Sequence, residues 1–535
     1  MSSSSKEAST TLITNKKSDT MLFYYNNPSQ PFRFELIPSH FDNIDLQLVN
    51  CSVASDVVLS KVVRVTLKNS KLNNGQPFSS GFIPLGVKSV ILDNVQVSVD
   101  VLPDSVVELE TYNLGQKINI PVSVTSFKAI NITPENVGPL PNSVVDVTLS
   151  FDPAPGFLPS SVTKFVSTKP INVAALPTSV NDLRVNFGSH QTATIEHPSS
   201  TKNLEIWVDN GPFPKIRKSI ESLRLVSILG SELTNELPSN LESLHIENLR
   251  NSPGKLPSNL KKLRLVFSEE ATFDLPTGFL PTQLEELKIS SNYKSSKVIP
   301  NFYPSTLTKL SLSDLKEDYG AEERILPAGT IPSSVIELEL NLYCELVSGS
   351  IPSSVKYLKL GKNVKKFNFA LLPDSVERLI LHDNFYASEI ARFPANLTHL
   401  SIYIDGSKPA TTLPEGLTHL VLQRSVEDQP IPSTVSFLQI DFNPKSQIPD
   451  HIRQLRLVIS DYYTNFTDLQ SNYFPSSLVA VNFQSNKDNS PVFNVPISVT
   501  SISKRINPNL SNFGVEFNYI PFFNSFDCFR NDFSL

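Results

Sequence analysis

The 535-residue sequence has little glycine and cysteine, and no long apolar run. Its 18 glycines are outnumbered by 41 prolines, so we expect proline, rather than residues that need positive φ, to form the corners of the chain. Its three cysteines, Cys51, Cys344 and Cys528, are far apart and odd in number, unlike the pattern of a disulfide-capped secreted protein. No stretch approaches the roughly 20 apolar residues that span a bilayer, and residues 1–20 lack the apolar segment of a secretory signal. The sequence therefore predicts a cytoplasmic protein that does not bind membranes.

An excess of charge of one sign is also absent. The chain has 46 Lys and Arg against 52 Asp and Glu, which argues against a dedicated binder of nucleic acid or of anionic membranes. It contains no glycine-rich phosphate loop and no HExxH, CxxC or GxSxG motif. We therefore predict a protein that is not an enzyme, with no catalytic residue, no cofactor and no metal site.

What the sequence does contain is a repeated phrase. Residues 351–360 read IPSSVKYLKL, and residues 331–340 read IPSSVIELEL. Copies recur about every twenty residues from Pro84 to Pro496, with a less regular copy at Pro38. In most copies an aliphatic residue precedes the proline, and others follow it three, six and eight residues later. A fixed period in this range is typical of a solenoid.

The physical role of the phrase follows from its spacing. Leu358 and Leu360 alternate with the polar Lys359, which predicts a short strand with one buried face. Proline restricts the backbone at the corner that leads into the strand. One such unit cannot bury its apolar face alone, so neighbouring units must stack. The predicted fold is a repeat solenoid with a long parallel β-sheet of short strands and mostly irregular, helix-poor connections.

The VxxLxL core resembles the strand segment of leucine-rich repeats. The fuller unit resembles the FNIP repeats of that superfamily, through Phe493–Ile502 (FNVPISVTSI), Phe367–Leu381 (FNFALLPDSVERLIL) and the IPSSV copies. The resemblance implies a leucine-rich-repeat-like fold and a protein-interaction scaffold. Some relatives carry an F-box ahead of the repeats, but the register here begins by Pro38, so we do not expect one.

The resemblance also bears on asparagine. An asparagine occurs eleven residues after the proline in a few coils, similar to the asparagine that bonds backbone between coils in leucine-rich repeats. Its copies are too few to predict a continuous ladder: Asn292, Asn363, Asn384 and Asn443.

The sequence divides into four segments. Residues 1–20 are rich in Ser, Thr and Lys, which predicts a disordered tail. Residues 21–58 are expected to form an N-terminal cap and a first irregular repeat, and residues 59–503 the solenoid. Residues 504–535 are rich in phenylalanine. We interpret them as a C-terminal cap, because an uncovered end of a stacked array would aggregate.

Binding residues on a solenoid lie where the repeat leaves positions free. These are the outward strand positions, five and seven residues after the proline. Two groups stand out there. The first is a basic stripe in which only Glu286 opposes the cations: Arg224, Lys262, Arg264, Lys288 and Lys309. The second is an apolar and aromatic patch: Tyr357, Arg378, Ile380, His399, His419, Val421 and Phe437.

Exposed apolar patches mark interaction sites, and aromatic and arginine side chains are common hot spots. We therefore predict that the patch and the stripe dock an acidic and apolar segment of a protein partner. The alternative is that a neighbouring loop or a second copy of the chain covers the patch. His399 and His419 should stack in adjacent coils, but two ligands do not make a metal site, so an ordinary side-chain ladder is favoured.

A different hypothesis concerns residues 213–229, which read FPKIRKSIESLRLVSIL. Written as a helix, this segment is basic and amphipathic, with Ile216, Leu223 and Leu229 as anchors, and is typical of a calmodulin target. The protein would then bind calmodulin in a calcium-dependent manner. Ile220, Leu223 and Leu225 also fit the strand register, so the competing interpretation is one more coil of the solenoid.

Overall fold

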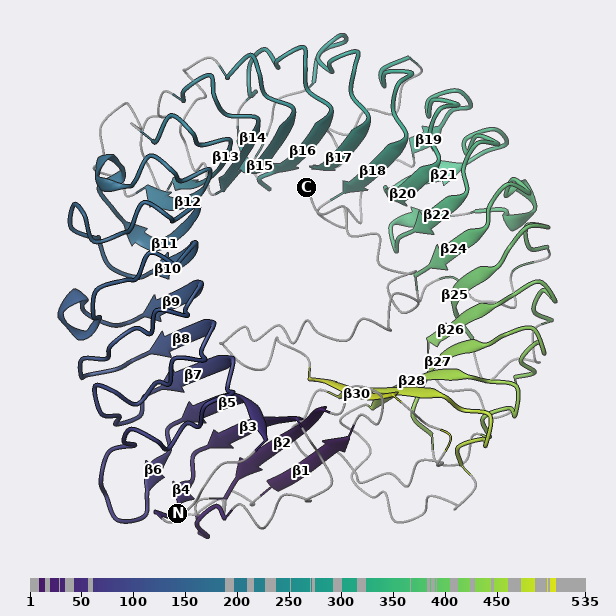
Figure 1. Ribbon diagram of the computed structural model, residues 1–535. Coiled ribbons are helices and arrows are strands. Elements are labelled where there is room, and N and C mark those ends of the chain that lie inside the picture. Colours follow the sequence, from purple (N-terminus) through teal and green to yellow (C-terminus); the bar gives the residue numbers. More distant parts are fainter. Residues whose placement is uncertain are drawn as a thin grey trace, which may run out of the picture. The chain divides into compact units, whose positions relative to one another are not determined.

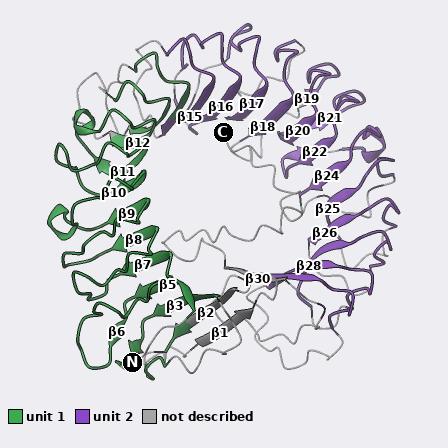
Figure 2. Cartoon of the chain, in the orientation of Figure 1, with its two compact units in different colours: residues 1–224 green, residues 225–535 purple. Residues whose placement is uncertain are grey.

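The chain folds into two compact units, residues Met1–Arg224 and Leu225–Leu535, coloured separately in Figure 2. The structure is a computed structural model. It describes residues 9–14, 20–27, 29–33, 43–55, 61–187, 197–208, 216–226, 237–250, 252–269, 271, 275–291, 301–314, 324–365, 367–382, 385, 390, 392–404, 412–423, 429–443, 447–459, 473–485, 498 and 501–506.

Nearly all regular elements are short strands (Figure 1). The strands that begin in unit 1 are β1 (Ser9–Thr14), β2 (Thr20–Asn26), β3 (Asn43–Val49), β4 (Ser52–Val53), β5 (Val62–Lys68), β6 (Lys71–Leu72), β7 (Ser89–Asp93), β8 (Glu108–Tyr112), β9 (Ser126–Ile130), β10 (Asp146–Leu149), β11 (Lys164–Pro170), β12 (Asp182–Phe187), β13 (Asn203–Val208) and β14 (Ser222–Val226).

The strands of unit 2 are β15 (Ser243–Leu249), β16 (Lys262–Phe267), β17 (Glu286–Ser291), β18 (Lys309–Asp314), β19 (Arg324–Leu326), β20 (Glu337–Asn341), β21 (Cys344–Leu346), β22 (Tyr357–Leu360), β23 (Val364–Lys365), β24 (Arg378–Leu381), β25 (His399–Tyr403), β26 (His419–Gln423), β27 (Phe437–Asp441), β28 (Gln454–Ile459), β29 (Ala480–Ser485) and β30 (Ser501–Ile506). Three short 3₁₀ helices complete the described elements: η2 (Pro134–Asn136), η3 (Val173–Ala175) and η5 (Phe369–Leu371).

In each unit the main strands pair in parallel, one coil beside the next. Unit 1 has the order β2-β3-β5-β7-β8-β9-β10-β11-β12-β13. Unit 2 has the order β15-β16-β17-β18-β20-β22-β24-β25-β26-β27-β28-β29-β30. The long sheet lies along the inner side of each unit and the connections along its outer side (Figure 2). The predicted solenoid with helix-poor connections is confirmed.

The repeated phrase builds one coil as its spacing predicts. Val355, three residues after Pro352, donates its N–H to the proline carbonyl at 3.1 Å and closes the turn before β22. Val355 and Leu358 are fully buried, and Leu360 is 1% exposed. Lys359, which lies between these two leucines on the strand, is exposed. The apolar positions of the phrase therefore form the core, and alternation along each strand leaves the others facing away from it.

A serine two residues after the proline joins each coil to the preceding one. The hydroxyl of this serine donates a hydrogen bond to the neighbouring coil and not to its own corner. Ser123 Oγ donates to the Val106 carbonyl at 2.6 Å, and Ser354 Oγ donates to the Val335 carbonyl at 2.7 Å. Equivalent bonds come from Ser105, Ser143, Ser161, Ser179, Ser375 and Ser477. The recurrence of serine in the phrase thus reflects satisfaction of a carbonyl between coils.

On the outer side, small sheets and 3₁₀ turns cover the core. β4 pairs with β6 in unit 1, and β19, β21 and β23 form a three-stranded sheet in unit 2. Asn172 and Asn368 each cap a 3₁₀ helix by accepting the N–H two residues later.

The strands nearest the two ends of the chain can be compared with the predicted segments 1–20 and 504–535. β1 pairs antiparallel with β2 and lies inside residues 1–20, so the predicted disordered tail differs from the structure over Ser9–Thr14. β30 includes residues 504–506 of the predicted C-terminal cap, and the rest of that cap lies outside the described residues. Cys51 and Cys344 are buried and form no disulfide among the described residues, and Cys528 also lies outside the described part.

Candidate functional site

Strand register lines the outward residues of unit 2 up in two columns. The first column, five residues after the proline, runs from β16 to β27 through Lys262, Glu286, Lys309, Glu337, Tyr357, Arg378, His399, His419 and Phe437. The second, seven residues after the proline, runs through Arg264, Lys288, Ser311, Glu339, Lys359, Ile380, Ser401, Val421 and Gln439.

The first part of these columns alternates in charge. Lys262 Nζ lies 3.3 Å from Glu286, and Lys309 Nζ lies 3.4 Å from Glu337. In the second column Lys359 Nζ lies 3.6 Å from Glu339. Facing carboxylates therefore neutralise these lysines at the distance between neighbouring strands.

Three of the five members of the predicted basic stripe carry ion pairs. Lys262 and Lys309 are paired as above, and Arg224 on β14 lies 3.6 Å from Glu205 on β13. Sequence reasoning counted only Glu286 against the stripe. It did not count Glu205, which forms an ion pair with Arg224, or Glu337, which is the register partner of Lys309. Arg264 and Lys288 are register partners of each other in the second column.

The predicted patch is less exposed than expected. Tyr357, Val421 and Phe437 are only 4%, 6% and 1% exposed, so the prediction of a contiguous exposed apolar surface is wrong for them. In-register stacking is a physical cause, since the rings of His419 and Phe437 lie 5.4 Å apart with an interplanar angle of 26°. The four other members of the patch are half-buried: Arg378, Ile380, His399 and His419.

His399 and His419 stack, as their register predicts. Their ring centroids are 4.1 Å apart and their planes differ by 9°. Thr398 Oγ1 donates to the Glu377 carbonyl at 3.0 Å and lies 2.8 Å from His399 Nδ1. A hydroxyl has one proton to give, so Nδ1 is the donor in the second bond. Thr418 repeats the arrangement with His419 at 2.9 Å.

Burial and charge keep both imidazoles neutral. Burial, followed by the neighbouring His419 and Arg378, lowers the pKa of His399 to about 3. Burial and Arg378 also lower the pKa of His419. Because the two rings are nearly parallel and each turns Nδ1 toward its own threonine, their second nitrogens do not converge on one point. Among the described residues, no group of three or more His, Cys, Asp or Glu side chains could hold a metal.

Arg378 and Tyr357 interrupt the alternation of charge. They are register partners on β24 and β22. Within the described part of the chain, Arg378 makes no ion pair, although it is half-buried. The Tyr357 hydroxyl is buried and has no hydrogen-bond partner. Burial, followed by Glu339 and Glu337, raises the Tyr357 pKa, so the phenol is protonated and available as a donor.

The chain is similar to known proteins in part of its sequence and in its fold. A family model described as FNIP Repeat matches residues 323–363, which include β20 and β22. These residues are therefore similar to an FNIP repeat. The fold of the chain is similar to that of CroV588, described as a novel circular LRR protein structure. That likeness has 19% identity and a TM-score of 0.51, and covers 92% of this chain and 80% of that chain.

A weaker likeness is to YopM from Yersinia enterocolitica, with 16% identity and a TM-score of 0.34, covering 78% of this chain and 91% of that one. No curated protein matches the chain in sequence. The similarity to CroV588 confirms a leucine-rich-repeat fold. In the described parts of the chain, no helix is both long and apolar enough to span a membrane.

Residues 213–229 give no support to the calmodulin hypothesis. Within them, residues 222–226 form strand β14 and no helix is present over the described residues 216–226. Ile216 and Leu223 are 6% and 1% exposed and face the core, while Leu229 lies outside the described residues. The strand register predicted by Leu223 and Leu225 prevails, because burying them in the stack removes more apolar surface from water than a free helix would.

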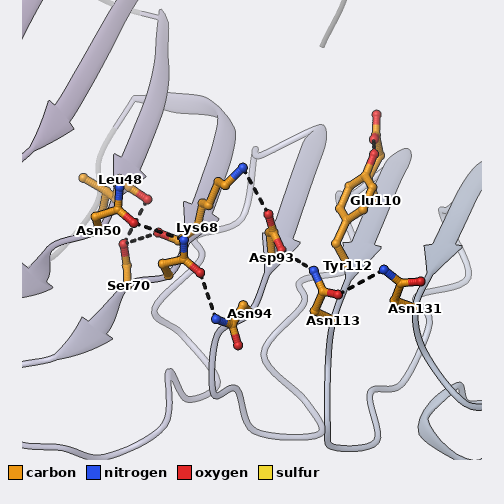
Figure 3. A network of polar contacts seen from close by, with 11 residues as sticks. Leu48, Asn50, Lys68, Ser70, Asp93, Asn94, Glu110, Tyr112, Asn113 and Asn131 are labelled. Carbon is orange, nitrogen blue, oxygen red and sulfur yellow. Dashed lines mark hydrogen bonds and ion pairs between the residues drawn. The ribbon is translucent and has the colours of Figure 1, made fainter. Parts of the chain in front are cut away.

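Sequence reasoning missed an asparagine ladder in unit 1 (Figure 3). Asn69, Asn94, Asn113 and Asn131 follow the position of the proline by ten residues, not eleven, and all have φ near +50°. Asn69 Nδ2 donates to Asn50 Oδ1 at 3.0 Å and Asn94 Nδ2 to Asn69 Oδ1 at 2.8 Å. Asn131 Nδ2 donates to Asn113 Oδ1 at 3.3 Å. The recurrence of asparagine ten residues after the position of the proline was the sequence signal that could have revealed this ladder.

In unit 2 the role that the resemblance implied for asparagine is found at Asn363. This side chain is 2% exposed, and its Nδ2 donates to the backbone carbonyls of Asp314 and Asn341 at 3.2 and 3.3 Å. It thus bonds backbone across coils, as expected. Asn292 and Asn384 lie outside the described residues.

Proposed function

We propose that this protein is a non-enzymatic scaffold that binds a segment of a protein partner on the outward strand columns of unit 2, from β22 to β27. The observation that carries the proposal is a change in the chemistry of the outward side chains along these columns. From β16 to β22, three outward lysines pair with glutamates of neighbouring strands: Lys262 with Glu286, Lys309 with Glu337 and Lys359 with Glu339. From β24 to β26 the outward side chains include the half-buried Ile380, His399 and His419, which offer apolar and imidazole surface to a partner.

Further support comes from rigidity. In-register parallel pairing fixes neighbouring backbones, so a partner meets side chains that are already ordered and the loss of conformational entropy on binding is small. Imidazoles that are neutral at pH 7 also cost less to desolvate than charged ones. The basic stripe contributes less than the sequence suggested, because three of its members are already paired.

A matched pair of variants tests the proposal. Ile380 and Ile91 are both half-buried and both stand seven residues after a proline or its equivalent, in units 2 and 1 respectively. The intact chain, Ile380→Ser and Ile91→Ser are each immobilised and exposed to lysate of the cells that express the protein. We expect a partner protein to be retained by the intact chain and by Ile91→Ser, and to be lost with Ile380→Ser. Equal retention by all three would place binding elsewhere.

A further inference from the structure

Between β20 and β26, the pairing of charge along the outward columns leaves Arg378 without a carboxylate among the described residues. Lys262, Lys309 and Lys359 each face a carboxylate within 3.6 Å or less. Arg378 is followed in its column by two neutral imidazoles and preceded by a phenol, so no carboxylate is its register partner. A half-buried guanidinium with no opposite charge is unfavourable, and a ligand that supplies the charge would remove this cost.

A second, independent observation lies beside it. The hydroxyl of Tyr357, a side chain only 4% exposed, has no hydrogen-bond partner. A buried hydroxyl without a partner costs free energy that an acceptor would recover. Tyr357 and Arg378 are register partners on adjacent strands, so their side chains are neighbours on the same face. Together they offer a planar, multi-donor cation and one neutral donor.

We propose that Arg378 and Tyr357 form the seat for one carboxylate, the side chain of an aspartate or glutamate in an extended segment of the partner. This inference rests on the proposed function and names the chemistry that it recognises. Guanidinium binds carboxylate with two parallel hydrogen bonds, which gives both strength and geometric selectivity. The phenol donates a third bond to the same group.

The surrounding charges are compatible with an incoming anion. Glu337 and Glu339 lie on the β20 side, but Lys309 and Lys359 pair with them. On the β25 side, burial lowers the pKa of His399, so its imidazole is neutral. Its Nδ1–H group donates a hydrogen bond to Thr398 Oγ1. The carboxylate would therefore meet Arg378 as the one outward cation between β20 and β26 with no ion pair among the described residues.

The test is a selection of peptides on the intact chain. A phage library of random heptapeptides is selected on the wild type, on Arg378→Gln and on Arg184→Gln. Arg184 is the control, because it is an outward arginine paired with Glu205 at 3.7 Å in unit 1. We expect an aspartate or glutamate at one fixed position in peptides selected by the wild type and by Arg184→Gln, and none with Arg378→Gln. Changing that acid to its amide should weaken wild-type binding roughly tenfold to a hundredfold.

Tyr357→Phe provides a second readout. Peptide affinity should fall roughly threefold to tenfold, while the melting temperature stays the same or rises because a buried unpartnered hydroxyl is removed. A lower melting temperature would show instead that the hydroxyl has a structural role, and would contradict its assignment. Selected peptides without a fixed acidic position, if they are still lost with Ile380→Ser, would overturn the carboxylate seat but support the docking face. Failure to select any peptide would contradict both.

Discussion

The imidazole rings of His399 and His419 stack with their centroids 4.1 Å apart, on neighbouring strands β25 and β26. Arg378 stands next in the same column. The register of the repeat therefore places two titratable rings and a permanent cation in a row, so we expect the stability of the fold to depend on pH.

Stability should fall as the pH drops below about 7, in part because of these two rings. An unfolded histidine has a pKa of about 6.5, whereas burial, His419 and Arg378 hold the pKa of folded His399 at about 3. Between these values the unfolded chain binds more protons, so lowering the pH favours unfolding. We expect the loss of melting temperature between pH 7.5 and pH 5 to be smaller in His399→Gln/His419→Gln than in the wild type. An identical loss in both proteins would contradict this account.

Asn113 should be sensitive to alanine for two separable reasons. Its φ of 53° is unfavourable for alanine, and its side chain joins Asp93 and Asn131 across coils at 2.9 and 3.3 Å. We expect Asn113→Ala to lower the free energy of unfolding by about 2–3 kcal/mol. Asn113→Gly tolerates the φ and loses only the hydrogen bonds, so it should cost about 1 kcal/mol. Urea denaturation of both variants measures the difference, and equal costs would remove the role assigned to φ.

The serine that joins coils should be replaceable by threonine but not by alanine. Ser123→Ala removes the 2.6 Å bond to the Val106 carbonyl and should cost about 1 kcal/mol of unfolding free energy. Ser123→Thr should cost much less, because Thr306 makes the equivalent bond to Leu284 at 2.7 Å in its own coil. The same denaturation measurement distinguishes them. If alanine and threonine behaved alike, the recurrent serine would need another explanation.

Phe437 should behave as a core residue although its position faces outward. At 1% exposure, Phe437→Ala should lower the free energy of unfolding by about 3–5 kcal/mol. Ile380→Ala, at a half-buried position of the second column, should cost about 1 kcal/mol or less. Thermal unfolding of the two variants compares them. A small effect at Phe437 would mean that its ring is not packed as the structure has it.

The solenoid could be predicted from the sequence because its cause is local. The alternation of Leu358 and Leu360 with Lys359 determines which face of a strand is buried, and the proline determines where the strand begins. Neither inference needs knowledge of another coil. Residues 216–226 form a coil of the solenoid and not a helix for the same reason. Ile220, Leu223 and Leu225 keep the spacing that is common to the other coils.

The outward face could be predicted only in part, because its properties depend on pairs of coils. The ring of Phe437 loses exposure through His419, a residue eighteen positions away in the sequence. Arg224 is neutralised by Glu205, and Arg378 is left over because its register partner is a tyrosine. Such relations follow from register between strands rather than from composition along one strand. The asparagine ladder was missed for a similar reason, since its members bond to asparagines of other coils.

Photo-cross-linking from the outward face tests the central claim most directly. A photoreactive amino acid is placed at position 380 of the intact chain and, as a control, at position 91. The account predicts that a partner cross-links from position 380 and not from position 91, through a segment that contains an aspartate or glutamate. Cross-linking from position 91 alone, or from neither position while the partner is still bound, would contradict it.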